Sequence, residues 1–155
     1  MDLHPIIVHF PVALLTLYGI FELFSVRRIA RKPYWFYVKA VLVIFGALGA
    51  LAAWLTGESA SHYVEGVALV DMHASFAGAT VILSSVIALI YLLVWFGKEK
   101  VQEYAWKFLS NRGAMIPLAL ALVVLVIITG ALGGAIVYGT QFDPFMAPIF
   151  HLLGV

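Results

Sequence analysis

The five histidines are the residues of this sequence that could do chemistry. Imidazole nitrogens ligate transition metals and haem iron, and they exchange protons near neutral pH. The chain has no cysteine, so thiolate metal sites, iron–sulfur clusters and covalently attached c-type haem are excluded for this chain. The candidate ligands are His4, His9, His62, His73 and His151.

Most of the chain is apolar enough to lie in a lipid bilayer. Apolar residues make up 64% of the 155 residues and charged residues 11%, whereas about a quarter of a soluble domain is charged. A helix needs roughly 20 residues to cross the hydrocarbon core, and a lone strand cannot satisfy its backbone there. We therefore expect an all-α, single transmembrane domain over 1–155. Its helices should span about 5–26, 36–56, 68–96 and 114–138, followed by an interfacial tail at 139–155.

The distribution of charge predicts the orientation of these helices. All nine basic residues fall in or beside two connections, and they are Arg27, Arg28, Arg31, Lys32, Lys39, Lys98, Lys100, Lys107 and Arg112. Basic loops stay in the cytoplasm. We therefore expect an up-down-up-down four-helix bundle with both termini on the outer, periplasmic side. This orientation puts all five histidines at the outer end.

Two histidines lie within apolar runs, where polar groups are costly and usually functional. His9 is about one turn into the first helix, and His73 is near the start of the third. The first and third helices of such a bundle are diagonal partners, so the two imidazoles could face each other at similar depth. That arrangement suits bis-histidine ligation of a b-type haem. His4, His62 and His151 could form a second haem site, although an isolated histidine at an interface is more often a solvated polar residue.

Small residues on the other two helices could leave room for a flat macrocycle. They are Gly46, Gly49, Ala50, Ala53, Gly130, Gly133 and Gly134. Small residues at this spacing are also typical of plain helix-packing surfaces. Both interpretations remain open from the sequence.

Other classes of site have weaker signals. A Zn or Cu centre could use three or four imidazoles, but no spacing such as His-Glu-x-x-His is present. Glu22 is expected to pair with Arg27 or Arg28, and a proton path is the alternative. The sequence contains no nucleotide-binding loop, nucleophile elbow or paired-carboxylate pattern. Its basic loops indicate topology rather than nucleic-acid binding.

The motifs at the helix ends resemble a known bacterial membrane family. Leu3-His4-Pro5 followed by Val8-His9-Phe10-Pro11 is similar to the "LHP…VHFP" start of the family called domain of unknown function 2231. The end of the fourth helix, Thr129-Gly130 with Gly133-Gly134 and Val137-Tyr138, resembles its "TG…GG.LVY" element. Family members often continue with His-Gly, whereas Gly139 follows here; His151 could replace that histidine.

The resemblance implies redox work at the outer face of the bacterial inner membrane, because similar domains occur joined to cytochrome c or Rieske modules. We therefore expect a multi-pass haem b protein with one haem, and histidines enough for a second. It would act as an electron-transfer subunit rather than a stand-alone enzyme. Its expected partners are the lipid bilayer, a periplasmic cytochrome c or iron–sulfur protein, quinone, and other membrane subunits or a second copy. The alternatives are a cofactor-free anchor of a redox complex and the Zn or Cu site.

Overall fold

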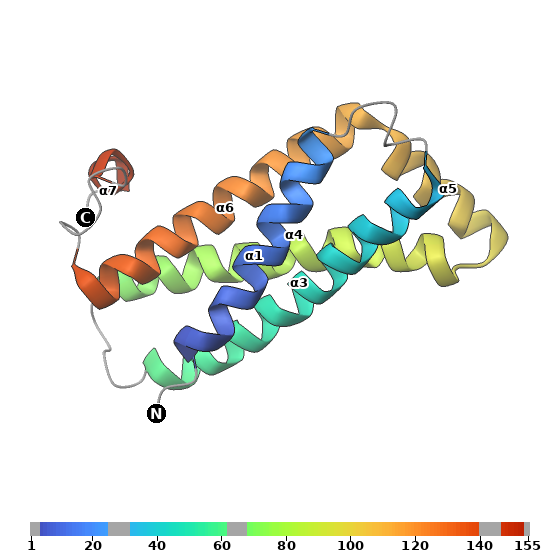
Figure 1. The fold of residues 1–155 in the computed structure, drawn as a ribbon. Helices are drawn as coiled ribbons and strands as arrows, with labels where there is room; N and C mark the ends of the chain where they lie inside the picture. The colour runs from blue at the N-terminus through green and yellow to red at the C-terminus, as the bar shows by residue number, and fades with distance from the viewer. Residues whose placement is uncertain (1–3, 25–31, 62–67, 140–146, 154–155) are drawn as a thin grey trace.

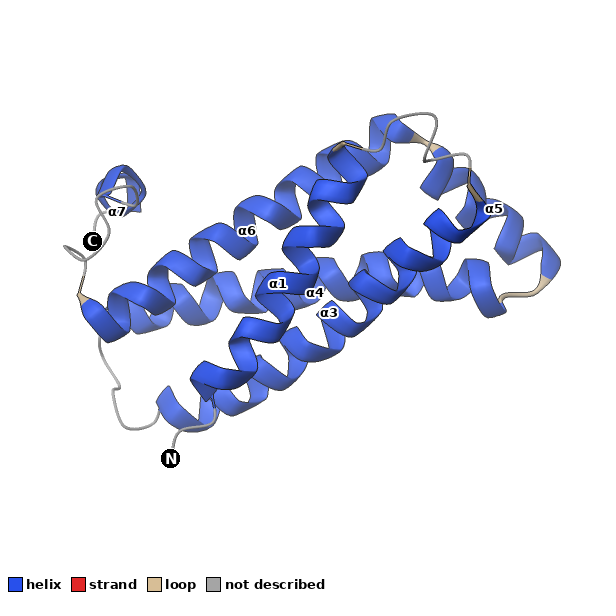
Figure 2. Cartoon of the chain, in the orientation of Figure 1, coloured by secondary structure: helices blue, strands red, loops and turns tan. Residues whose placement is uncertain are grey.

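The described part of the chain consists of helices and short turns. The computed structural model describes residues 4–24, 32–61, 68–139 and 147–153, and none of these residues forms a strand (Figure 2). The helices are α1 (His4–Leu23), α3 (Pro33–Ser61), α4 (Ala68–Phe96), α5 (Glu99–Ser110), α6 (Arg112–Tyr138) and α7 (Ala147–Leu153). Four of them, α1, α3, α4 and α6, are long and apolar enough to cross a membrane. The prediction of four helical spans is confirmed.

The four long helices pack as a closed ring of neighbours. α1 packs against α3 and α6, and α4 packs against the same two helices, so α1 and α4 are diagonal. Figure 1 shows the starts of α1 and α4, and the ends of α3 and α6, toward one end of the bundle. We call this the histidine end, because His9 and His73 lie in the first turns of α1 and α4. The opposite end carries α5, and we call it the α5 end.

One buried core joins all four long helices over much of their length. It is formed by Leu15, Tyr18, Ala40, Val43, Ala47, Ala50, Ile87, Ala88, Tyr91, Met115, Leu122 and Val126. A second cluster lies at the histidine end and draws only on α4, α6 and α7. There Phe150 of α7 packs with Leu132 and Ala135 of α6. The predicted tail therefore contains a short helix that docks one aromatic side chain on the bundle.

Glycines let α1 and α3 approach closely. A Cβ added to Gly46 would lie 2.5 Å from Cδ2 of Leu15, and one added to Gly49 would lie 2.9 Å from Cδ1 of Phe10. Since α1 side chains fill the space above both glycines, they serve helix packing in this structure. Small residues at membrane helix interfaces commonly have this role.

The helix α5 was not among the predicted elements. Its apolar residues Val101, Ala105 and Phe108 recur at helical spacing; Ala105 is buried, whereas Val101, Phe108 and the lysines Lys100 and Lys107 are exposed. Such a helix, with basic and aromatic side chains, suits the plane of a membrane interface. The connection 97–113 was expected to be only a basic loop, although its sequence contains this periodicity.

The close contact at Gly46 gives a stability test. Gly46→Ala adds a methyl group beside the fully buried Leu15, and overpacking of this kind costs about 1–3 kcal/mol. We expect the melting temperature in detergent to fall by several degrees. Gly78→Ala is the matched control, because its nearest neighbour, Nε1 of Trp54, would lie 4.0 Å away. Equal melting temperatures for the two variants would contradict the close packing.

Candidate functional site

The ring of His73 is oriented by a hydrogen bond to another helix. Its Nδ1 lies 3.0 Å from the carbonyl oxygen of Thr129 on α6, and the residue is half-buried. A carbonyl oxygen can only accept, so Nδ1 is the donor in this hydrogen bond. In the neutral imidazole the lone pair is then on Nε2. Histidines that ligate metals are typically oriented by such a bond from the other ring nitrogen.

Of three neighbouring glycines of α6, Gly133 lies against this imidazole, and Gly130 and Gly134 do not. A Cβ added to Gly133 would lie 3.1 Å from Cε1 of His73, whereas Cβ atoms added to Gly130 and Gly134 would meet nothing within 4 Å. Gly133 therefore lets the imidazole lie against the backbone of α6. Gly130 is exposed, so the space above it opens to the surface of the described helices.

The other predicted ligands have different positions. His9 is exposed on α1, and His151 is exposed on α7. His4 begins α1, and His62 lies outside the described residues. Among the residues that the structure describes, no three His, Asp or Glu side chains lie close enough to hold a metal ion. The pairing of His9 with His73 stays a prediction.

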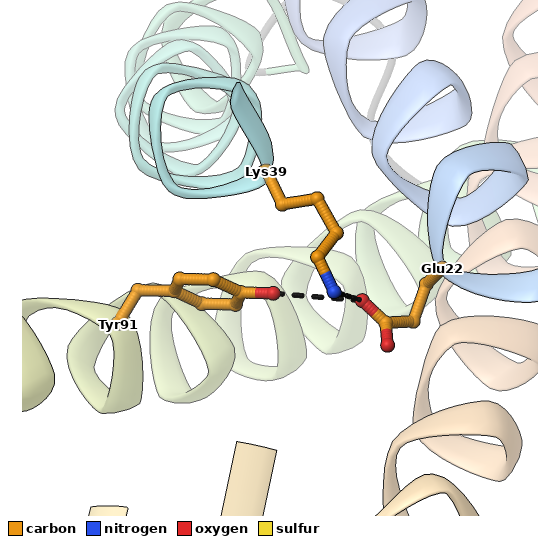
Figure 3. Close-up of polar contacts among 3 residues, drawn as sticks. All are labelled: Glu22, Lys39 and Tyr91. Atoms are coloured by element: carbon orange, nitrogen blue, oxygen red, sulfur yellow. Dashed lines mark hydrogen bonds and ion pairs between the residues drawn. The ribbon is translucent and has the colours of Figure 1, made fainter. Parts of the chain in front are cut away.

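A buried ion pair lies nearer the α5 end of the bundle (Figure 3). Nζ of Lys39 on α3 lies 2.6 Å from Oε2 of Glu22 on α1. The hydroxyl of Tyr91 on α4 donates to the same oxygen across 3.5 Å. Tyr18 packs edge-on against Tyr91, with ring centroids 6.0 Å apart. Two helices, α3 and α4, thus each place a polar group on one carboxylate of α1.

Glu22 pairs with Lys39 in the structure, a partner that was not predicted. The expected partners Arg27 and Arg28 lie outside the described residues, so pairing with them stays a prediction. The sequence does contain the signal. Glu22 and Lys39 are opposite charges within two successive membrane spans, and ionisable residues there usually pair with each other.

The match to a family model covers most of the chain. Residues 1–143 match the model described as a predicted membrane protein, DUF2231. The chain belongs to this family. No curated protein and no solved structure matches it. The matched range contains all four spans and every residue of the two polar sites on α1, α3, α4 and α6, which therefore belong to the DUF2231 part of the chain.

The Glu22–Lys39 pair predicts strong coupling between two variants. Removing one partner of a buried pair leaves an uncompensated charge and costs about 3–5 kcal/mol, whereas replacing both with apolar residues is often close to neutral. We expect Glu22→Leu and Lys39→Met each to lower the melting temperature in detergent by more than the double variant does. Additive losses in the double variant would contradict the pairing.

Proposed function

We propose that this DUF2231 protein binds haem b at the histidine end and carries electrons between a periplasmic redox partner and the membrane. The observation that carries the proposal is the orientation of His73. Its Nδ1–H is directed to the Thr129 carbonyl, and Nε2 would be the nitrogen that ligates iron. Bound haem would supply one-electron chemistry. The Thr129 carbonyl orients the imidazole that would hold the iron.

The chemistry of the surrounding residues fits a haem. Gly133 admits the imidazole, and no other side chain of the described residues lies within 4 Å of the Cβ positions of Gly130 and Gly134, so a haem could lie against α6 there. Among the described residues, the buried cluster near His73 draws on α4, α6 and α7, so a planar group on that side would not displace the core that the four long helices share. No cysteine is needed for a b-type haem.

Helix register favours His4 over His9 as the second axial ligand. His4 precedes Glu22 by 18 residues, and His73 precedes Tyr91 by the same number. Eighteen residues are five complete turns, so each histidine lies on the same face of its helix as Glu22 or Tyr91. Those two residues form a hydrogen bond across the bundle. If both diagonal helices continued as ideal, parallel helices, His4 and His73 would come at the same height, about 27 Å beyond that hydrogen bond.

The same count places His9 on another face of α1. It precedes Glu22 by 13 residues, which turns it about 140° away from the Glu22 face. This agrees with its exposed position. We therefore propose His4 and His73 as the axial pair, with His9, His62 and His151 outside it. The pairing of His9 with His73, which the sequence suggested, is the alternative assignment.

The proposed setting is the inner membrane of a bacterium. The basic residues around the first and third connections favour an up-down-up-down bundle with both termini in the periplasm. The histidine end then faces the periplasm, where a cytochrome c or an iron–sulfur protein could exchange electrons with the haem. Quinone, other membrane subunits or a second copy are the proposed partners within the membrane.

Absorbance spectra test the cofactor and its ligands. We expect the purified chain, after haem supplementation, to show reduced-minus-oxidised bands of a six-coordinate b haem. His73→Ala and His4→Ala should each lose these bands, whereas His9→Ala should keep them. A colourless wild-type protein refutes the haem proposal and leaves a cofactor-free anchor. Loss of the bands in His9→Ala but not in His4→Ala refutes only the axial assignment.

The orientation can be tested separately, because the chain has no native cysteine. Asp71 and Ser110 are both exposed, near the histidine end and the α5 end respectively. In intact spheroplasts we expect a membrane-impermeant maleimide to label Asp71→Cys and not Ser110→Cys. After lysis both should react. Labelling of Ser110→Cys alone before lysis would reverse the proposed orientation.

A further inference from the structure

A hollow at the α5 end is lined by aromatic rings and carboxylates. It has a volume of about 550 Å³ and lies between the start of α3, the end of α4 and one face of α5. The residues around it are Phe36, Tyr37, Val94, Trp95, Glu99, Gln102, Glu103 and Trp106. It shares no residue with the histidine end.

The hollow is built by local contacts that hold α5 against α4. The side-chain amide of Gln102 donates to the carbonyl oxygen of Val94 across 2.7 Å. A Cβ on Gly97 would collide with the carbonyl oxygen of Leu93, so the tight turn between α4 and α5 requires glycine. These two features fix α5 as one wall of the hollow.

The aromatic lining is a connected cluster rather than a set of separate rings. Phe36 lies 5.8 Å from Trp106 and 6.5 Å from Trp95 between ring centroids, and Tyr37 lies 5.3 Å from Trp95. Tyr37, Trp95 and Trp106 are all exposed. Their accessible faces can attract a cation such as a primary ammonium group.

Two carboxylates add negative charge to the same wall. Glu99 and Glu103 are one turn apart on α5, a spacing at which like charges destabilise a helix. Neither forms an ion pair with any residue in the described ranges. A bound cation would remove this repulsion. The aromatic faces and the two carboxylates therefore favour the same kind of ligand, a small organic cation.

We infer that this hollow binds the ammonium headgroup of an aminophospholipid. The spans of α3 and α4 begin and end beside it, at Tyr34 and Phe96, so the hollow lies where lipid headgroups lie. Exposed Lys98 and Lys100 flank Glu99 and can pair with the lipid phosphate. Phe96, which is 75% exposed, can contact an acyl chain. The positive and negative parts of the headgroup thus each have a matching partner.

Native mass spectrometry of the full chain in detergent tests this site. We expect phosphatidylethanolamine to bind roughly tenfold more than phosphatidylglycerol with the same acyl chains, because only the former has the ammonium group. Glu99→Gln combined with Glu103→Gln should remove the preference. Asp71→Asn is the matched control at the opposite end and should keep it. Equal binding of both lipids to the wild-type chain would overturn the inference.

Two further variants separate the site from a folding defect and from a different occupant. Trp106→Leu keeps both carboxylates and should also reduce the preference, with an unchanged helical circular dichroism spectrum; an unchanged preference counts against the aromatic site. Arg27→Gln with Arg28→Gln removes two arginines of the connection that precedes α3 in the sequence. If the wild-type chain shows no preference and this variant gains one, an arginine occupies the hollow and the lipid assignment is wrong.

Discussion

The buried contact among Glu22, Lys39 and Tyr91 sets the register of the bundle. A carboxylate in a membrane span is tolerated when a counter-charge and hydrogen bonds compensate its lost hydration. Here one carboxylate oxygen receives the ammonium group of α3 and the hydroxyl of α4. Sliding any of the three helices by one turn, about 5.4 Å, would break these contacts. Apolar packing between lipid-facing helices discriminates far less between registers.

The buried residues on the two sides of this ion pair come from different sets of helices. Toward the α5 end, all four long helices share a core, and Glu22 sits among its tyrosines. Toward the histidine end, the buried cluster involves only α4, α6 and α7. The space beside Gly130 and Gly134 belongs to this second region. A cofactor or partner can thus be accommodated at one end while the register is kept by the other.

Much of the fold, and less of the site, follows from the sequence. The predicted helix 68–96 coincides with α4, because uninterrupted apolar length is a local property. The partner of Glu22 and the roles of the glycines depend on which helices become neighbours. Gly49 packs against Phe10 of α1, whereas Gly133 packs against His73 of α4. Nothing in the local sequence separates these two glycines. The helix α5 is the opposite case, since its periodicity was present in the sequence.

We propose that two imidazoles, one from α1 and one from α4, would hold one haem iron. Electron paramagnetic resonance of the oxidised, haem-loaded chain at low temperature tests this most directly. Ferric haem with two imidazole ligands gives a low-spin signal. We therefore expect that signal in the wild-type protein and a high-spin signal when either ligand is removed. A high-spin signal in the wild-type protein would show that the iron has only one protein ligand, and it would contradict the proposed pair of imidazole ligands.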